Sequence, residues 1–507
     1  MVQCNRPLRG RHAGPYHAAE RDSPQDSRLL YVLSISIFEE EWCMFTSGQS
    51  KRGQMSRRHF LQLSAAVGGA ALVSACAPSA PGGQSQQAAT GSEAAAPPAD
   101  TQVVVEAWAH WEQGLQWLED AMKNYGFTDE HPNISLNKVV APFNEIHDKM
   151  LAACASGVGV PDIMRVEQGR MAAFFKGQEI CFVDLTDLIG DKINDLVLGS
   201  AVDYWSWQGA IYGIGNEMNA CTLAYRKAVF DELGIETPFK TWEDLKVAGE
   251  ILKREKDMYI ISFHDLHDGD FQIMLYAAGG LMFDENGDFG GLNDLGKEIL
   301  EYQRSMVHDL GFATIAPVTG DSTWSPPIYW EAFRQNQIAT TMGAPWHNGK
   351  LGRDDKIGPG QEGEWRLQEL PGGIGEGLPT ATHGGTSVSI PKLAQHPEEA
   401  WMIIEFTHLT RAVLEDTQQR GIIPTYKPVL TDPILNEPYD YYGGQVIGEL
   451  YLKLADAMPR IYQSPWAPEF HTAFQNIVLT PVLQDNNQDY DTLFADLETE
   501  LQRIKSM

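Results

Sequence analysis

Aromatic and hydrogen-bonding side chains follow several short apolar segments of this chain. Four such places are Trp108-Ala109-His110-Trp111-Glu112, Glu167-Gln168, His264-Asp265 and Trp346-His347. Flat rings cover apolar surfaces, whereas carboxylate, amide and imidazole groups bond to hydroxyls in fixed directions. A sugar has apolar C–H faces and a belt of hydroxyl groups, so a site for it needs both kinds of side chain. The sequence therefore offers the chemistry of a saccharide-binding site.

Motifs for metal binding and catalysis give weaker signals. The run from His264 to Asp270 contains enough ligand types for a metal, but a solvated acidic loop has the same composition. The aspartates from Asp284 to Asp288 do not form an EF-hand, because Phe289 and Leu295 stand where Gly and Glu are needed. The chain has no GxSxG or HExxH motif, and its glycine-rich segment 372–377 does not match GxGxxG. We expect no catalytic residue, no cofactor and no metal.

The chain is strongly acidic, with a formal net charge of −30 over 507 residues. Its first 76 residues carry nine Lys or Arg and six Asp or Glu, so the net charge beyond them is near −33. Such a surface repels phosphate backbones, which argues against nucleic acid as a partner. The acidic composition is compatible with a cationic ligand. It is also compatible with a glycosidase that uses a pair of carboxylates.

The N-terminal part carries signals for export and anchoring. Ser56-Arg57-Arg58-His59-Phe60-Leu61 is a twin-arginine motif, and the weakly apolar segment after it is too short to span a membrane. That segment ends in Leu72-Val73-Ser74-Ala75-Cys76, which looks like a bacterial lipobox, so we expect a lipid on Cys76. Residues 1–54 precede this leader, predicted at 55–76, and are interpreted as a non-native upstream extension. Residues 77–100 are rich in Ala, Pro, Gly, Ser and Gln and predict a flexible tether.

Three cysteines follow Cys76, and their spacing matches neither CxxC nor a Cys/His metal pattern. An odd number leaves at least one thiol free. Cys154 and Cys221 lie in apolar helix and strand contexts, so we expect both to be buried packing residues. The state of Cys181 is left open.

The region after the tether alternates strands and helices. The predicted strands cover 103–108, 134–140, 161–166 and 182–185, and the predicted helices cover 115–125, 143–156 and 169–176. Strands that alternate with helices of this length indicate βαβ units and a largely parallel sheet. The predicted fold class is therefore α/β.

A central stretch, Tyr204 to Leu252, connects this region to the rest of the chain. Ala220 to Tyr225 predicts a buried strand, and Lys227 to Leu233 predicts a short helix that Gly234 stops. Thr241 then starts a second helix, with Asp244 three residues later as an acidic version of the capping box.

The order of short runs in this stretch is more specific than any single run. The runs are Tyr212-Gly213-Ile214-Gly215, Tyr225-Arg226-Lys227 and Lys240-Thr241-Trp242-Glu243-Asp244-Leu245. The stretch resembles the central segment of the extracytoplasmic solute-binding proteins of ABC importers, in the carbohydrate-binding branch related to maltose-binding protein. Gly215 and Arg226 replace the Pro and Asn that are usual there. Further matches, such as Pro161-Asp162-Ile163 and Gly343-Ala344-Pro345-Trp346, extend the resemblance over Val103 to Ile504.

The resemblance implies a two-lobe periplasmic-binding fold of type II with the ligand in a cleft between the lobes. Lobe 1 would comprise about 101–218 plus part of 384–507, and lobe 2 about 219–383 plus the rest. Asn219, Trp346, His347 and Trp466 fall at positions where the family has ligand contacts. With the residues noted above, the predicted ligand-binding residues are His110, Trp111, Glu167, Gln168, Asn219, His264, Trp346, His347 and Trp466.

The function implied is that of a monomeric, lipid-anchored binding protein, not an enzyme, at the outer face of the cytoplasmic membrane. It would capture a sugar or oligosaccharide, close around it, and deliver it to the permease subunits of an ABC importer. The lipid anchor would be its only contact with the membrane. Two alternatives are kept: the same fold binding a peptide, polyamine or other polar solute, and an extracytoplasmic glycoside-processing enzyme.

Overall fold

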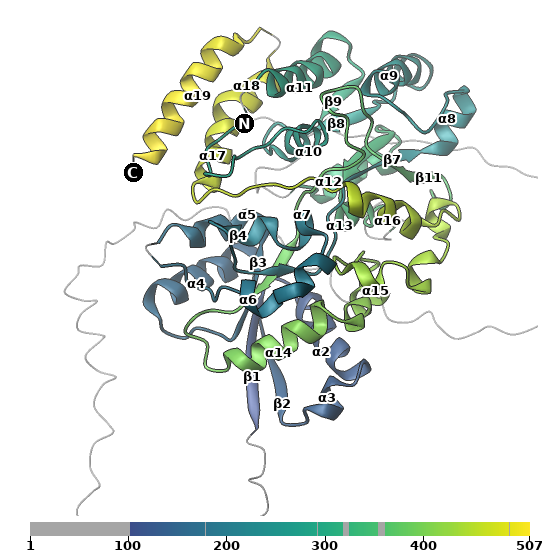
Figure 1. Ribbon diagram of the computed structural model, residues 1–507. Helices are drawn as coiled ribbons and strands as arrows, with labels where there is room; N and C mark the ends of the chain where they lie inside the picture. The colour runs from purple at the N-terminus through teal and green to yellow at the C-terminus, as the bar shows by residue number, and fades with distance from the viewer. Residues whose placement is uncertain are drawn as a thin grey trace, which may run out of the picture. The chain divides into compact units, whose positions relative to one another are not determined.

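The computed structural model describes residues 102–506, apart from 178, 292, 318–323, 353–359 and 486. The predicted upstream extension, leader, tether and Cys76 lie outside these residues. The described chain forms two lobes, each built on its own sheet (Figure 1). In this part of the protein, no helix is both long and apolar enough to cross a bilayer.

Lobe 1 is built on a five-stranded sheet with the strand order β2-β1-β3-β12-β6. The strands are β1 (Val103–Ala109), β2 (Ile134–Val140), β3 (Ile163–Glu167), β6 (Ile214–Gly215) and β12 (Thr386–Ser389). β1 is parallel to both neighbours, as predicted, whereas β12 is antiparallel to β3 and to β6. The strand predicted at 182–185 is wrong, because only Phe182 forms a single bridge there, to Pro391.

Helices cover both faces of this sheet because β1 is apolar on both sides. Val105, Ala107 and Ala109 pack in one cluster with α2 and α14, whereas Trp108 packs in another with α4. The helices of lobe 1 are α2 (Gln113–Asn124), α3 (Phe127–Glu130), α4 (Phe143–Ser156), α5 (Gln168–Met171), α6 (Thr186–Ile189), α7 (Leu198–Ala201), α14 (Pro397–His408) and α15 (Leu414–Arg420). Shorter elements are the 3-10 turns η1 (Ala172–Phe175), η2 (Gly190–Asp195), η3 (Asp203–Trp205), η5 (Arg411–Val413) and η6 (Lys427–Val429), and the strands β4 (Ser206–Trp207) and β5 (Ala210–Ile211).

Lobe 2 is built on an antiparallel sheet with the order β10-β7-β11 and on a parallel pair of strands. Its strands are β7 (Thr222–Arg226), β8 (Ile261–Phe263), β9 (Ala313–Ile315), β10 (Thr340–Gly343) and β11 (Trp365–Gln368). Its helices are α8 (Lys227–Leu233), α9 (Trp242–Lys256), α10 (Gly269–Ala277), α11 (Asp294–Arg304), α12 (Pro327–Arg334), α13 (Pro345–Asn348), α16 (Ile447–Ala457), α17 (Ala467–Phe474), α18 (Thr480–Gln484) and α19 (Tyr490–Lys505). The π-helical segments η4 (Ser305–Asp309) and η9 (Gln475–Leu479) and the 3-10 turns η7 (Pro433–Asn436) and η8 (Asp440–Tyr442) complete it.

The central stretch folds as its local signals predict. The strand predicted from Ala220 to Tyr225 is β7, which spans Thr222–Arg226. Gly234 ends α8 with a left-handed φ of 66°. The Thr241 hydroxyl accepts the N–H of Asp244 at 3.1 Å, and the Asp244 carboxylate accepts the N–H of Thr241 at 2.9 Å. This capping box satisfies two otherwise unpaired donors, so α9 begins at the predicted place.

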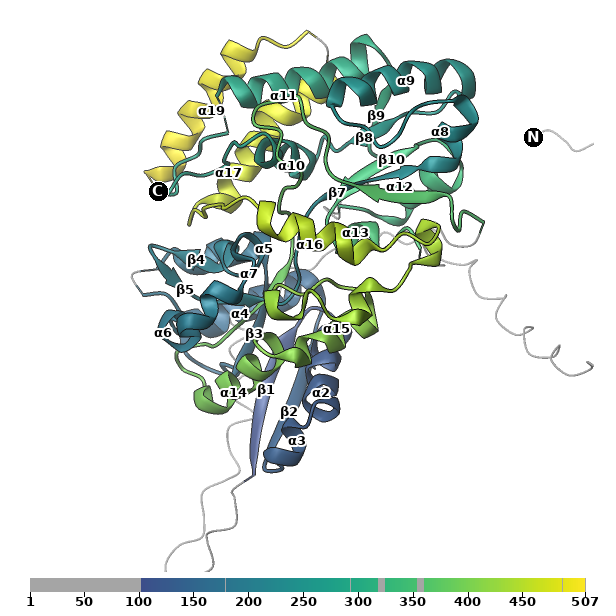
Figure 2. The same cartoon turned by 45° about the vertical axis from the view of Figure 1, so that its right-hand side comes forward.

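Three segments connect the lobes and lie side by side. They are 216–221 between β6 and β7, 369–385 between β11 and β12, and 421–446 between α15 and α16. Ala220 pairs with Thr382, and Glu217 pairs with Pro424. Figure 2 shows α15 and α16 on either side of this junction. Because the segments are paired through their backbones, a change in the conformation of one segment requires a change in the other two.

Cys154 and Cys181 form a disulfide, and Cys221 is free and buried. The prediction for Cys221 is confirmed, whereas the prediction that Cys154 is a packing thiol is wrong. The fold brings the last turn of α4 beside the loop after η1, although 27 residues separate the two cysteines. A spacing of that kind carries no signal in a single sequence.

Candidate functional site

The segment between β11 and β12 lies at the centre of the junction. The N–H of His383 donates to the carbonyl oxygen of Asn219 at 3.3 Å, and the N–H of Gln168 donates to the carbonyl oxygen of Gly385 at 3.0 Å. Gly385 has a φ of 109°, and a Cβ there would lie 2.2 Å from the Asn219 side chain, so the close approach requires glycine. Two predicted site residues, Gln168 of lobe 1 and Asn219 of the first connecting segment, therefore flank this segment.

Trp346 approaches the same segment from lobe 2. Its indole Nε1 donates to the carbonyl oxygen of His383 at 3.1 Å, and a Cβ on Gly384 would lie 2.7 Å from that nitrogen. The Lys350 ammonium lies 5.0 Å from the centroid of the ring. Trp346 is half-buried, so its ring is held in a fixed orientation with part of its surface free.

His110 and Trp111 extend from the end of β1 on the lobe 1 side. Their rings lie 4.2 Å apart, and the His110 ring also lies 5.1 Å from Phe143. Burial, helped by the nearby His147, lowers the pKa of His110 to about 3, so the ring is neutral near pH 7. The Arg165 guanidinium lies 4.8 Å from the centroid of the Trp111 ring and thereby supports it from within the lobe.

Glu167 ends β3 and caps α5. Its Oε2 accepts the N–H of Gly169 at 2.8 Å, and its own N–H donates to Nε2 of His147 at 3.2 Å. Burial raises the pKa of this carboxyl to about 7, and the Gly169 bond and Arg170 only partly oppose that effect. At neutral pH Glu167 can therefore either donate or accept a hydrogen bond.

Asn219 is fully buried in the first connecting segment. Its Nδ2 donates to the carbonyl oxygen of Glu217 at 3.2 Å, and its backbone N–H donates to Oγ of Ser200 at 3.0 Å. Its Oδ1 has no hydrogen-bond partner among the described residues. An unpaired buried acceptor costs about 1–3 kcal/mol, so this oxygen is suited to a ligand hydroxyl.

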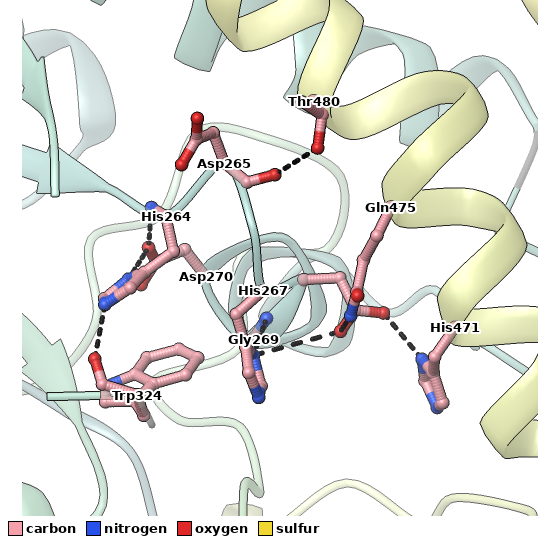
Figure 3. Close-up of polar contacts among 10 residues, drawn as sticks. His264, Asp265, His267, Gly269, Asp270, Trp324, His471, Gln475 and Thr480 are labelled. Carbon is pink, nitrogen blue, oxygen red and sulfur yellow. Dashed lines mark hydrogen bonds and ion pairs between the residues drawn. The ribbon is translucent and has the colours of Figure 1, made fainter. Parts of the chain in front are cut away.

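His264 is held entirely by the protein (Figure 3). Its Nδ1 lies 2.7 Å from Oδ2 of Asp270, and its Nε2 lies 2.6 Å from the carbonyl oxygen of Trp324. The ring is also stacked against Trp324 at 4.5 Å. Because both nitrogens have protein partners, we do not keep His264 among the proposed ligand residues.

His347 and Trp466 occupy different environments. His347 is fully buried behind Trp346, with Nε2 at 3.0 Å from the Thr341 hydroxyl. Trp466 is half-buried just before α17, and the Lys176 ammonium of lobe 1 lies 5.1 Å from its ring centroid. Lys176 also pairs with Glu469, so this side of the junction is a contact between lobes.

Trp324, His267 and His383 lie at the junction but were not among the predicted residues. The Trp324 ring lies 4.6 Å from that of His383 and 5.0 Å from that of His267. His267 is in the loop between β8 and α10, where Asp268 is bound by His471 and Gln475 (Figure 3). Only His383 had a usable signal in the sequence, since it directly precedes the pair Gly384-Gly385.

Three cavities of about 470 to 600 Å³ lie elsewhere on the surface, and none is lined by a predicted ligand residue within the described part of the chain. The same residues contain no group of three or more His, Cys, Asp or Glu side chains placed to hold a metal ion. The site is thus a set of rings and amides around the junction, together with the Glu167 carboxyl. Two sheet-based lobes, paired connecting segments and a site where they meet define the class of type II periplasmic binding proteins.

The chain belongs to the family of bacterial extracellular solute-binding proteins, whose family model matches residues 81–406. A twin-arginine translocation signal matches residues 54–74. The resemblance and the twin-arginine prediction are therefore confirmed, and together they indicate export out of the cytoplasm.

Individual relatives agree with the family. Arabinooligosaccharide-binding proteins of Bacillus subtilis and Halalkalibacterium halodurans are 28% and 25% identical to this chain over 294 and 386 residues. These alignments cover 57% and 74% of this chain, and 66% and 84% of the two relatives. The sugar-binding protein MalE from the phytopathogen Xanthomonas citri is 19% identical with a TM-score of 0.64, over 79% of this chain and 97% of that one. That structural likeness confirms the predicted two-lobe fold.

Proposed function

We propose that this protein binds a sugar or oligosaccharide outside the cytoplasm and delivers it to the permease of an ABC importer. The observation that carries the proposal is that Trp346, Asn219 and Gln168 all hydrogen-bond to the segment from His383 to Gly385, with the Trp346 ring half-buried. A ring that stacks on C–H faces and amides that bond to hydroxyls are the two elements of saccharide recognition. The names of two relatives, both arabinooligosaccharide-binding proteins, favour the same ligand class.

Hinge bending about the three connecting segments would close the lobes on the sugar. Trp346 stacks on a sugar ring, while Asn219, Gln168, Glu167 and His110 bond to its hydroxyls. Trp466 covers the opposite side from its position before α17. Binding without turnover is the simplest role for such a site. Glycoside hydrolysis needs two carboxyl groups, and Glu167 is the one carboxyl among the proposed ligand residues.

Residues 101–507 should be screened by calorimetry against arabinotriose, lactose, maltotriose, amino acids and spermidine, with product analysis of every saccharide that binds. We expect saturable binding of one saccharide per chain and no product. Release of a shorter sugar would replace the proposal with a glycoside-processing enzyme. Binding of spermidine alone would keep the fold and change the ligand class.

We also propose that lipid on Cys76 holds the mature protein at the outer face of the membrane. The support is the sequence that precedes Cys76, directly after the twin-arginine signal. Full-length protein and Cys76→Ser should be expressed in a bacterial host with radiolabelled palmitate. We expect label and membrane association for the first and neither for the second; equal labelling would disprove the assignment.

A further inference from the structure

One segment of lobe 2 lies against lobe 1, although it is not one of the three connecting segments. It comprises residues 459–469, which follow α16 and end in the first turn of α17, and we call it the strap. Figures 1 and 2 show it between the two lobes, on the way from α16 to α17. Because the chain enters and leaves the strap in lobe 2, the path of the chain does not require any contact with lobe 1. The contacts therefore depend on the strap's own residues.

The first contact of the strap is with Asp203 in η3 of lobe 1. Nε of Arg460 donates to Oδ2 and Oδ1 of Asp203 at 2.8 Å and 3.0 Å, and Nη2 donates to Oδ1 at 2.8 Å. The backbone N–H of Ile461 donates to Oδ2 at 3.0 Å. Asp203 is 4% exposed, and burial raises the pKa of its carboxyl, whereas the bonds from Arg460 and Ile461 oppose that effect. A carboxylate that is buried in lobe 1 thus depends on donors from lobe 2.

Two further contacts hold the strap close to the surface of lobe 1. Nε2 of Gln463 donates to the carbonyl oxygen of Tyr204 at 3.2 Å, and both residues are buried. A Cβ on Gly199 of α7 would lie 2.3 Å from the carbonyl oxygen of Pro459, so this approach requires glycine. The strap is therefore packed against lobe 1 without space for a methyl group at Gly199.

The far end of the strap contacts Lys176, which follows η1 of lobe 1. The Lys176 ammonium forms an ion pair with Glu469 and lies 5.1 Å from the centroid of the Trp466 ring. The side chains of Lys176 and Glu469 are 28% and 34% exposed, so the pair is partly shielded from solvent. The two partners are 293 residues apart in the chain, so the contact depends on how the lobes are arranged.

Separation of the lobes would break contacts of the strap in either of two ways. If the strap stayed with lobe 2, Asp203 would lose its donors and Lys176 its partner. If the strap stayed on lobe 1, it would have to pull away from α16 and α17, whose apolar residues are packed in hydrophobic clusters of lobe 2. Both movements cost free energy, so the strap favours the arrangement in which the lobes are together.

We propose that the strap is a restraint between the lobes that opposes their separation. This inference rests on the proposed hinge movement and goes beyond it, because the restraint comes from outside the connecting segments. Contacts that must break before the lobes open also slow the release of a bound solute.

Distances between the lobes test the strap directly. Azide-bearing amino acids replace Val158 after α4 of lobe 1 and Val247 in α9 of lobe 2, which are 75% and 51% exposed, and each is coupled to a nitroxide. This labelling leaves the cysteines of the full chain unchanged. Pulsed electron paramagnetic resonance, without any added sugar, then gives the ratio of separated to closed lobes.

Asp203→Asn and Lys176→Met each remove one charged contact of the strap. Asp203→Asn acts on a buried group and should raise the ratio of separated to closed lobes at least about tenfold. Lys176→Met acts on a partly exposed pair and should raise it about two- to fivefold, and it decides the question if Asp203→Asn does not fold. Lys192→Met is the matched control, because Lys192 pairs with Glu405 at 2.9 Å within lobe 1 and both side chains are 39% exposed.

Strap variants with the same ratio as Lys192→Met would overturn the inference, and so would lobes that are already separated in wild type. Salt gives an independent check, because it screens the pair of Lys176 and Glu469. Raising NaCl from about 0.05 M to about 0.5 M should increase the ratio in wild type more than in Lys176→Met. An equal response of the two proteins would contradict the part assigned to Lys176.

The proposed function is tested separately. With a saccharide that binds, Lys176→Met should release it about two- to fivefold faster than Lys192→Met. If a saccharide binds but the strap variants leave the distances unchanged, the inference fails and the proposed function stands. If no saccharide binds, the proposed function fails, whereas the distances still decide whether the strap restrains the lobes.

Discussion

The indole Nε1 of Trp346 donates a hydrogen bond to the carbonyl oxygen of His383 at 3.1 Å. Trp346 belongs to α13 of lobe 2, whereas His383 belongs to the segment that returns the chain to lobe 1. The ring that we expect to stack on the sugar is therefore hydrogen-bonded to one of the three segments that connect the lobes. If the lobes close as proposed, this bond couples the ligand contact to their movement.

Replacement of Trp346 by Ala should weaken saccharide binding at least about tenfold, because the variant loses both the stacking surface and the bond to His383. Titration calorimetry at pH 7 measures the change. Trp401→Ala is the matched control, since Trp401 is also half-buried but lies on α14, away from the junction. If Trp346→Ala and Trp401→Ala bind the saccharide with the same affinity, the assignment of Trp346 to the binding site is wrong.

Glu167→Gln should remove part of the pH dependence of stability. The pKa of Glu167 is raised from 4.5 to about 7, so between these pH values the folded protein holds a proton that the unfolded chain releases. The stabilisation is complete below pH 4.5 and disappears as the pH rises through 7. As the pH rises from 4 to 8, the free energy of unfolding of the variant should therefore increase by about 1–3 kcal/mol relative to that of wild type. Urea unfolding at several pH values tests this, with the exposed Glu112→Gln as the control; parallel curves for wild type and Glu167→Gln would refute it.

Asp416→Ala should destabilise the junction strongly. The buried carboxylate accepts hydrogen bonds from Arg420 and from Asn216, whose Oδ1 accepts a bond from the fully buried Arg165 at 3.2 Å. Removing the carboxylate takes the hydrogen-bonded partner from Arg420 and leaves Glu217 to balance the buried charge of Arg420 and Arg165, which costs about 3–5 kcal/mol.

The matched control for this change is a surface ion pair of the same chemical type. Arg411 pairs with Asp432 at 2.7 Å, but its side chain is 65% exposed. Arg411→Ala should therefore cost under about 1 kcal/mol. Urea unfolding measures both variants, and a small loss for Asp416→Ala would show that the network does not stabilise the junction.

Reduction of the Cys154–Cys181 disulfide should lower the free energy of unfolding by about 3–4 kcal/mol, because the bond closes a loop of 27 residues. Unfolding with and without dithiothreitol measures the effect. Cys154→Ser should reproduce it and no longer respond to the reductant. Cys221 is free and buried, so a response that persists in Cys154→Ser would have to come from another thiol and would contradict the assignment.

Much of the fold follows from local signals in the sequence. The strands from Val103 to Glu167, the Gly234 stop and the Thr241 capping box were predictable, because each depends on residues close in sequence. The position of β12 between β3 and β6 was not predicted, since strand pairing over more than two hundred residues has no local signature. The disulfide was missed for the same reason.

The site was harder to predict than the fold. Gln168, Asn219 and Trp346 do hydrogen-bond to one segment, and Gln168 directly follows β3, whereas Asn219 directly precedes the strand predicted from Ala220 to Tyr225. The sequence could not show that Asp270 and Trp324 take both nitrogens of His264, because burial and partner choice depend on tertiary packing. Trp324 itself lies far from any predicted strand end, and only the folded chain places it against His383.

The place of β12 has a consequence for how the chain folds. The strand fills the position between β3 and β6, yet it ends only at Ser389. A nascent chain that has released β1, β2, β3 and β6 still has a gap in the middle of its first sheet, with unpaired backbone on both sides. The first lobe thus cannot be completed in the order in which it is synthesised. Completion of this sheet must wait until residue 389 of 507 has been made, which favours slow folding and leaves open sheet edges exposed in the meantime.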